Sequence, residues 1–350
     1  MVKILSCGAM VRGYKTYECA NDKCSHTKHV TFSFKSRFCP TCGKKATDLW
    51  INKQRDTLPH TDWQHITLTM PSLLWPLFEQ ERSLLDELPK IAANIFKTLA
   101  RKRNINPGIF IALHTFGRDL NWHVHVHLSV TLGGLSLDNK QWRKLRFAKR
   151  AVMPMWRARV VKMIRKAKKQ NRINITSACL EIQYHKHWIV HFAKPANSSW
   201  NIVAYLGRYL KRSPLSQSRL AHYDGKTVTF NYLNHRNQKY QKATFDTNEF
   251  IHRFIQHIPD KGFRMILYYG FLVNRVSGKL LPLVYKLLNQ KIKTPKFIGW
   301  AGLINNAFGN NPLNCILPWH KMQLTRMSFG MNINQLLDNH EKIAKRKIII

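Results

Sequence analysis

A row of three histidines lies within residues 121–135, which read NWHVHVHLSVTLGGL. Imidazole and apolar side chains alternate there, and strict alternation predicts a β-strand that has one face in the core. Neighbouring imidazoles on such a strand are about 6.5–7 Å apart, so two rings can turn toward one divalent ion. Neutral imidazole is the commonest protein metal ligand, so we favour a metal site over a solvated strand face. The histidines are His123, His125 and His127, and the apolar residues are Val124, Val126, Leu128 and Val130.

The cysteines supply a second set of candidate ligands, because five of the seven lie in the first 42 residues. Two pairs, spaced C-x4-C and C-x2-C, are typical of a tetrahedral zinc site. A segment of ~50 residues has too small a core to fold without such support. Disulfides are the alternative, but they are disfavoured in a cytoplasmic protein. The predicted ligands of structural Zn²⁺ are Cys19, Cys24, Cys39 and Cys42, with Cys7, His26 and His29 as alternatives.

The charge balance indicates a polyanionic partner. The 350 residues include 57 Lys and Arg but 18 Asp and Glu, a net charge of +39. Nucleic acid is the default partner for such a chain, and an anionic membrane surface is the alternative. No apolar run reaches the ~18–20 residues of a membrane span, and no signal peptide is evident, so we expect a cytoplasmic protein. The scarcity of acidic residues also leaves histidines as better metal ligands than carboxylates.

The segments before the histidine strand predict an α+β fold. Residues 63–71 read as a short strand, residues 72–103 as a helix and residues 109–116 as a second strand. A turn then leads into the histidine strand, which Gly133 and Gly134 are expected to end. Short antiparallel returns of this kind favour an α+β sandwich over a doubly wound sheet.

Residues 140–172 form a long basic region that we expect to be helical. Few acidic residues are available to pair with its charges, so phosphate contact is favoured over a solvated face. Trp142 and Trp156 lie among the basic residues and could stack on unpaired bases. The predicted DNA-binding residues of this region are Arg143, Lys144, Arg146, Arg157 and Arg165.

Two tyrosines one helical turn apart are candidate nucleophiles. Residues 179–194 alternate as a strand and lead into a helix predicted over residues 198–212. Tyr205 and Tyr209 share one face of this helix, about 6 Å apart. Such a pair is more often part of a core, but this one lies among cationic residues. These residues complete the predicted DNA-binding set, and they are Arg208, Lys211 and Arg212.

The rest of the chain predicts further strands. Asp224 and Gly225 indicate a hairpin turn, and residues 239–245 read as another strand. The tail from residue 280 is basic and in part helical. We expect a zinc-binding, DNA-binding domain over residues 1–50, a catalytic core over residues 60–215, and a basic α/β region over residues 216–350 that completes the core and binds DNA.

A metal held by histidines and a tyrosine on a later helix suggest cleavage of one DNA strand. The metal would polarise a phosphate oxygen and offset charge in the transition state. A phenolate would attack in line, become a 5′-phosphotyrosine and release a 3′-hydroxyl. The covalent link retains the free energy of the phosphodiester, so rejoining requires no ATP. The unperturbed pKa of tyrosine is about 10, and a cationic setting favours the phenolate.

Three motifs and their order along the chain resemble those of the His-hydrophobic-His (HUH) rolling-circle nucleases, and specifically those of the two-tyrosine transposases of the insertion sequence 91 family. The zinc-binding front end and HIPDKGFRMILYYG extend this resemblance over nearly the whole chain. The three motifs are ITLTMP at residues 66–71, HVHLSVTLGGL at residues 125–135 and YLGRYLKR at residues 205–212.

The resemblance implies an antiparallel, ferredoxin-like or RRM-like palm with helices on one face. It implies that His125 and His127 bind Mg²⁺ or Mn²⁺, and it leaves His123 and His114 open as the third ligand. The implied substrates are single-stranded DNA at transposon ends and target DNA, bound by a nucleoid-associated bacterial protein of unspecified oligomeric state. The implied nucleophiles are Tyr205 and Tyr209. The resemblance also implies that Thr67 and Thr69 lie on the strand beside the metal strand.

Two departures from the family pattern concern zinc. A cysteine often stands where this chain has Phe34, and another often follows Cys315 in a C-x2-C. The second departure argues against a C-terminal metal knuckle. Two rival functions fit part of the sequence. One is a zinc-dependent nucleic-acid-binding protein without catalysis, and the other is a metal phosphodiesterase that uses His-activated water and gives the tyrosines no role.

Overall fold

The computed structural model divides into two compact units. Unit 1 comprises Met1–Trp50, Lys211–Ser213 and Lys296–Ile350, and unit 2 comprises Ile51–Leu210 and Pro214–Pro295. The structure describes residues 7–33, 39–210, 213–234, 237–260, 262–295, 297–316, 320–332 and 334–339.

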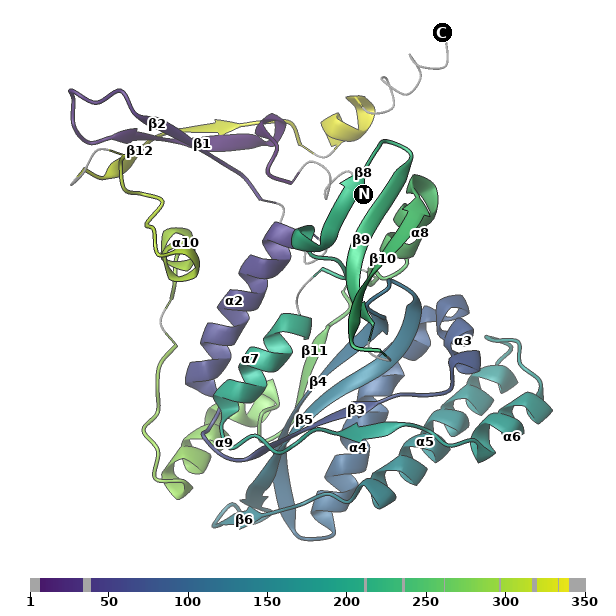
Figure 1. Ribbon diagram of the computed structural model, residues 1–350. Helices are drawn as coiled ribbons and strands as arrows, with labels where there is room; N and C mark the ends of the chain where they lie inside the picture. Colours follow the sequence, from purple (N-terminus) through teal and green to yellow (C-terminus); the bar gives the residue numbers. More distant parts are fainter. Residues whose placement is uncertain are drawn as a thin grey trace. The chain divides into compact units, whose positions relative to one another are not determined.

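Unit 2 is organised around an antiparallel sheet in the strand order β11-β4-β5-β3-β7 (Figure 1), with β6 paired to β5. This arrangement of helices and an antiparallel sheet confirms the predicted α+β class. The strands are β3 (Trp63–Leu68), β4 (Ile105–Phe116), β5 (Trp122–Ser136), β6 (Trp142–Lys144), β7 (Val190–Phe192) and β11 (Ile266–Gly270).

Two long helices, α4 (Glu87–Arg101) and α5 (Lys149–Lys169), pack on one face of this sheet and enclose the main core. The alternating apolar residues of β5 point into it, as the sequence predicted, and all four are fully buried. The predicted helix over residues 72–103 is interrupted, because Glu81 accepts a hydrogen bond from the backbone of Ser83 and starts a new turn. The segments before α4 are η2 (Ser72–Leu74), α3 (Trp75–Gln80) and η3 (Arg82–Asp86).

The glycine pair does not end the histidine strand, contrary to prediction. β5 continues to Ser136, and both glycines lie in close cross-strand contacts. A Cβ atom on Gly133 would lie 2.7 Å from Nε1 of Trp142, and one on Gly134 would lie 2.4 Å from the backbone oxygen of Asn106. The missing side chains let the neighbouring strands approach, so the pair serves the pairing of the sheet.

The strand predicted over residues 179–194 is also wrong in its first half. Residues Ser177–His185 form helix α6, and Thr176 caps it by accepting a hydrogen bond from the backbone N–H of Cys179. A threonine N-cap of this kind favours a helix over a strand. Within residues 179–194, the part that forms a strand is β7.

The basic region over residues 140–172 contains β6 before α5, and it does not expose both tryptophans. Trp156 is completely buried, and its Nε1 donates to the backbone oxygen of Thr69 at 2.7 Å. Trp156 is therefore a core residue and cannot stack on a DNA base. Trp142 is half-buried beside Phe271, with ring centroids 6.0 Å apart.

A second antiparallel sheet of unit 2 contains the predicted hairpin and the further strand predicted over residues 239–245. Asp224 stabilises the first turn, because its Oδ1 accepts hydrogen bonds from the backbone of Lys226 and Thr227. The sheet has the order β10-β9-β8 and packs through Phe230 against Phe250 of α8. Its elements are η4 (Gln217–Arg219), β8 (Leu220–Tyr223), β9 (Thr227–Asn234), β10 (Lys239–Asp246) and α8 (Thr247–Ile255), and α9 (Asn274–Leu287) follows β11.

Unit 1 combines segments from the N-terminal and C-terminal parts of the sequence. Its sheet has the order β12-β1-β2, and Cys19 at the end of β1 pairs with Met322 at the start of β12. We expected residues 216–350 to form one region, but the last part of that range groups with residues 1–50 because of this pairing. The elements are η1 (Met10–Arg12), β1 (Gly13–Cys19), β2 (Thr27–Thr31), α2 (Pro40–Thr57, of which residues 51–57 belong to unit 2), α10 (Trp300–Phe308) and β12 (Met322–Phe329).

Candidate functional site

The histidine strand β5 lies between β3 and β4 in the sheet of unit 2. In the antiparallel register, His125 pairs with His114 of β4 and His127 pairs with Thr67 of β3. Directly paired residues project from the same face of a sheet, so these side chains lie opposite the apolar core. One nitrogen from each of His114, His125 and His127 lies within 4.8 Å of the other two. The three imidazoles form a candidate metal centre.

Hydrogen bonds orient two of these imidazoles. Nδ1 of His125 donates to the backbone oxygen of His123 at 3.0 Å, which leaves Nε2 without a proton. Nδ1 of His127 lies 3.1 Å from Nε2 of His65, and Nδ1 of His65 lies 3.2 Å from Oγ of Ser129. Donation from His127 to His65 and from His65 to Ser129 leaves Nε2 of His127 unprotonated as well. Outer partners of this kind fix the tautomer and orientation of metal-binding histidines.

Burial keeps the imidazoles neutral. It lowers the pKa of His125 to about 3 and, together with nearby His191, the pKa of His65 to about 4. Burial and then the surrounding histidines, His114 foremost, hold the pKa of His127 well below its ordinary value. The neutral form is the one that binds metals. The centre can therefore take up a cation near neutral pH without first losing protons.

The structure brings His114, rather than His123, into the group of three. The ring of His123 instead lies against Trp75, with centroids 4.5 Å apart. His114 reaches the centre because β4 and β5 are paired at that position. The sequence left both residues open, and this cross-strand pairing is the reason to prefer His114.

His65 lies beside the centre, and its role there was not predicted from the sequence. It lies on β3 beside His127, and the two rings stack with centroids 5.3 Å apart. The signal was present, because Trp63, His65 and Thr67 alternate with the core residue Ile66 in the predicted strand. Their side chains must therefore share the face that carries the histidines of β5.

The predicted tyrosine helix is α7 (Ser199–Leu210), which contacts β3 and β4. Ile202 and Val203 of α7 are buried. They do not belong to the described core between the sheet and helices α4 and α5, so they must be buried against the other face of the sheet. We conclude that α7 packs against the sheet face that carries the histidines. The side chains of Tyr205 and Tyr209 lie outside the described part of the structure.

The predicted DNA-binding residues are spread over two sides of unit 2. Arg143 and Lys144 are exposed on β6, and Arg146 is exposed just after it. Arg157 and Arg165 project from α5, the helix that covers the face opposite the histidines. Both have protein partners, since Arg157 lies 4.8 Å over the ring of Tyr184 and Arg165 forms a 2.6 Å ion pair with Glu181. The side chain of Arg208, and Lys211 and Arg212 altogether, lie outside the described residues.

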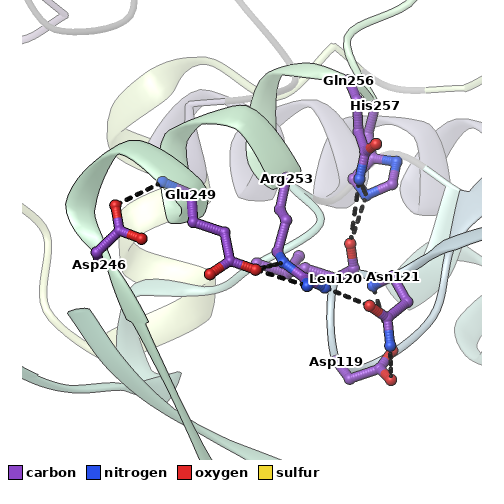
Figure 2. A network of polar contacts seen from close by, with 8 residues as sticks. All are labelled: Asp119, Leu120, Asn121, Asp246, Glu249, Arg253, Gln256 and His257. Atoms are coloured by element: carbon purple, nitrogen blue, oxygen red, sulfur yellow. Dashed lines mark hydrogen bonds and ion pairs between the residues drawn. The ribbon is translucent and has the colours of Figure 1, made fainter. Parts of the chain in front are cut away.

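The turn that leads into β5 is held by α8 and the residues after it (Figure 2). Arg253 of α8 donates to the side-chain oxygen of Asn121, and its Nε and Nη2 lie 2.8 and 2.7 Å from Oε1 of Glu249. Nε2 of His257 lies 3.0 Å from the backbone oxygen of Leu120. Leu120 has a positive φ of 63°, a conformation that this cluster of contacts supports. The start of the histidine strand is thus fixed by a distant part of unit 2.

Three of the cysteines in unit 1 form one cluster. Sγ of Cys7 lies 3.3 Å from Sγ of Cys42 and 3.4 Å from Sγ of Cys39. Cys39 and Cys42 are buried, and Cys42 lies in the first turn of α2. The alternative ligand Cys7 is therefore beside the predicted C-x2-C pair.

The other predicted pair, Cys19 and Cys24, belongs to a different cluster, with Cys315. The four cysteines expected to form one zinc site thus do not come together. The reason is the pairing of β1 with β12, which brings Cys315 to the loop that carries Cys19 and Cys24. The absence of a C-x2-C at Cys315 was a misleading argument against a metal cluster there. His26 joins this second cluster, whereas His29 lies 3.2 Å from Oγ1 of Thr16 and outside it.

Comparisons with known proteins find two family models and two relatives that match this chain. A family model described as "Putative transposase" matches residues 108–279, and a "Transposase zinc-binding domain" model matches residues 1–70. The chain is 40% identical over 363 residues to "Transposase for insertion sequence element IS801" of Pseudomonas savastanoi pv. phaseolicola, covering 100% of this chain and 88% of that protein. It is 29% identical over 297 residues to "Putative transposase y4qJ" of Sinorhizobium fredii, covering 79% and 75%. No solved structure gives a significant match.

These matches define the class of the protein as a transposase, a DNA-processing enzyme with a zinc-binding domain. More specifically, the chain belongs to the insertion sequence 91 family of transposases. DNA is accordingly its substrate, as the net charge of +39 predicted. Among the described helices, none is long and apolar enough to span a membrane.

Proposed function

We propose that this transposase nicks and rejoins single-stranded transposon ends through a tyrosine-linked intermediate, as in rolling-circle transposition. The observation that carries the proposal is the group of three imidazoles on β4 and β5. Their nitrogens lie within 4.8 Å of one another on the sheet face against which the tyrosine helix packs. In this interpretation the sheet of unit 2 is the palm of an HUH nuclease. The proposed catalytic core over residues 60–215 supplies all of its strands except β11, which comes from the region over residues 216–350 that was expected to complete the core.

The donor set fits one divalent cation. His114, His125 and His127 would hold it, because each offers one imidazole nitrogen to the group and the hydrogen bonds of His125 and His127 leave their Nε2 atoms unprotonated. Imidazole nitrogen is a softer donor than the oxygens that Mg²⁺ prefers. Of the two proposed ions, Mn²⁺ is therefore expected to support activity at lower concentration than Mg²⁺. The bound ion would withdraw charge from the scissile phosphate.

Tyr205 and Tyr209 are the proposed nucleophiles, and the backbone of α7 places them one turn apart. The phenol loses its proton, and its oxygen forms a bond to phosphorus while the bond from phosphorus to the 3′-oxygen breaks. The released 3′-oxygen takes a proton and becomes a hydroxyl. The second tyrosine can accept another strand while the first remains linked, and the reverse reaction rejoins the DNA.

The proposed DNA contacts in unit 2 are the exposed basic residues of β6 and of the segment directly after it. Arg143 and Lys144 pair with Gly134 and Gly133 of the histidine strand, and Arg146 follows two residues after Lys144. Arg157 and Arg165 are weaker candidates for the cleaved strand, because α5 covers the opposite face and both residues have partners. Arg208, Lys211 and Arg212 would bind phosphates next to the nucleophiles, and the zinc-binding domain would contact DNA as well.

The proposal is tested with labelled single-stranded DNA of the element's ends, incubated with purified protein and Mn²⁺ or Mg²⁺ and separated on a denaturing gel. A metal-dependent protein–DNA adduct is expected for the wild type. It should disappear in His127→Ala and in the Tyr205→Phe/Tyr209→Phe double variant. Tyr223→Phe is the matched control, because Tyr223 is an exposed tyrosine of β8 outside the tyrosine motif, and it should form the adduct normally.

Two other outcomes would favour the rival functions. Cleavage without an adduct would indicate a metal phosphodiesterase that uses water. Binding of cognate ends with neither cleavage nor adduct would indicate a zinc-dependent DNA-binding protein and would contradict the catalytic proposal.

A further inference from the structure

We propose that Cys19, Cys24, His26 and Cys315 form a second zinc site, separate from the cluster of Cys7, Cys39 and Cys42. This inference does not depend on the cleavage chemistry. Its ligand Cys315 lies far outside residues 1–70, the range matched by the zinc-binding family model. The proposed site therefore extends the zinc-binding domain to the C-terminal part of the chain.

The distances within the cluster fit a tetrahedral zinc ion. Sγ of Cys24 lies 3.7 Å from Sγ of Cys315, and the sulfurs of Cys19, Cys24 and Cys315 all lie within 4.8 Å of one another. Two sulfurs bound to one tetrahedral zinc ion are about 3.8 Å apart, because the zinc–sulfur bond is about 2.3 Å. No disulfide joins these three cysteines, so none accounts for their proximity.

The histidine completes the set of four ligands. Nδ1 of His26 lies 3.2 Å from Sγ of Cys315, and the backbone N–H of Ile316 points to the same nitrogen at 3.4 Å. A nitrogen that accepts this hydrogen bond carries no proton, which is the state a metal requires. Three thiolates and one imidazole are a common structural zinc set.

The backbone holds the ligands in two facing loops. Cys19 and Cys24 flank the turn after β1, where the N–H of Cys24 bonds to the carbonyl of Asn21 at 2.9 Å and the N–H of Asn21 lies 3.5 Å from Sγ of Cys19. On the other side, the N–H of Cys315 donates to the carbonyl of His320 at 2.9 Å. A third bond, from Ala20 to the carbonyl of Lys321 at 2.9 Å, joins the two loops.

The two cysteine clusters have different ligands and different supports. The first combines Cys7 with the start of α2, whereas the second joins the β1–β2 loop to the segment before β12. No cysteine belongs to both clusters among the residues that the structure describes. Each cluster supplies three thiolates, so we infer one zinc ion for each.

The test is the zinc content of purified full-length protein, measured by mass spectrometry in a His127→Ala background so that the histidine centre of unit 2 retains no zinc. We expect two zinc ions per chain, and one in the Cys315→Ala variant. Cys179→Ala is the matched control, because Cys179 lies on α6 outside both clusters, and it should retain two. One zinc ion in the parent protein, or no loss in Cys315→Ala, would overturn the proposal.

A second variant guards against misfolding of Cys315→Ala. His26→Cys should keep two metal ions and, after exchange for Co²⁺, strengthen the thiolate-to-cobalt charge-transfer absorption from six thiolates per chain to seven, about one sixth more. An unchanged cobalt spectrum at full metal content would show that residue 26 is not a ligand and would refute the four-ligand site.

Discussion

The histidine centre of unit 2 and the cysteine clusters of unit 1 position metal ligands in different ways. His125 and His127 of β5 each follow a valine that is buried under α4 and α5, so the packing of a large core places these imidazoles. In unit 1, β12 exposes most of its side chains and β2 has no buried residue. The histidine centre is therefore preorganised by burial, whereas the cysteine clusters of unit 1 depend on bound metal for their arrangement.

The largest expected effect is the loss of zinc from unit 1. Treatment with a strong chelator should unfold this unit and leave unit 2 folded, because structural zinc supplies about 10–16 kcal/mol of apparent binding free energy in small domains. Hydrogen exchange should then show rapid exchange of the amides of β1 and β12, with those of β4 and β5 still protected. Equal loss of protection in both units would contradict the comparison.

The next effect concerns the core that supports the histidines. Leu128 is fully buried between His127 and Ser129, so Leu128→Ala should destabilise unit 2 by about 2–5 kcal/mol. Denaturant unfolding of unit 2 measures the change. Leu324→Ala, an exposed position on β12, should change the stability of unit 1 by no more than about 0.5 kcal/mol in the zinc-bound protein.

Acid should weaken unit 2 through its buried neutral histidines, and His257 isolates part of this effect. Burial lowers the pKa of His257 to about 4, with the Leu120 carbonyl and Asp119 opposing the shift and Arg82 adding to it. Above pH ~6.5 the folded and unfolded forms are both neutral. Between pH ~6.5 and ~4 the unfolded form alone binds the proton, so stability falls as the pH falls.

The measurement is the free energy of unfolding at pH 6.5 and pH 5. On moving to pH 5, the wild type should lose about 2 kcal/mol more than His257→Gln, at 1.36 kcal/mol per pH unit. An equal loss in both proteins would show that His257 is not held neutral.

The most local expected effect concerns His65, which orients His127 without lying in the group of three. His65→Gln should weaken Mn²⁺ binding and nicking by about 10–100-fold while leaving the fold intact. Calorimetric titration with Mn²⁺ and the adduct assay measure the two effects. His185→Gln, an exposed histidine of α6, is the control. An unchanged Mn²⁺ affinity in His65→Gln would remove His65 from the centre.

Local patterns in the sequence were enough to predict much of unit 2. The alternation around His125 and His127 predicted both the strand and its buried face, and Asp224 with Gly225 predicted the hairpin of β8 and β9. Where the pattern was ambiguous, short-range hydrogen bonding decided the outcome. Thr176 capped α6 within a segment that alternates like a strand.

Contacts between distant segments could not be predicted from local patterns. Two C-x2–4-C pairs in one short segment suggested a single zinc site, but the site residues divide because β12 pairs with β1 and brings Cys315 to Cys24. His114 and His65 similarly enter the centre through strand pairing, which a single sequence does not specify beyond the face on which each residue lies.

The pairing of β1 with β12 has a consequence for the order in which the chain folds during synthesis. All of unit 2 lies between these two strands in the sequence, so a ribosome completes Ile51–Pro295 before it makes Met322. Domains generally fold as their sequences emerge. The sheet of unit 2 can therefore form on the ribosome before the zinc-binding unit can close, and a copy of the gene truncated before codon 315 would yield this sheet without a closed zinc-binding unit.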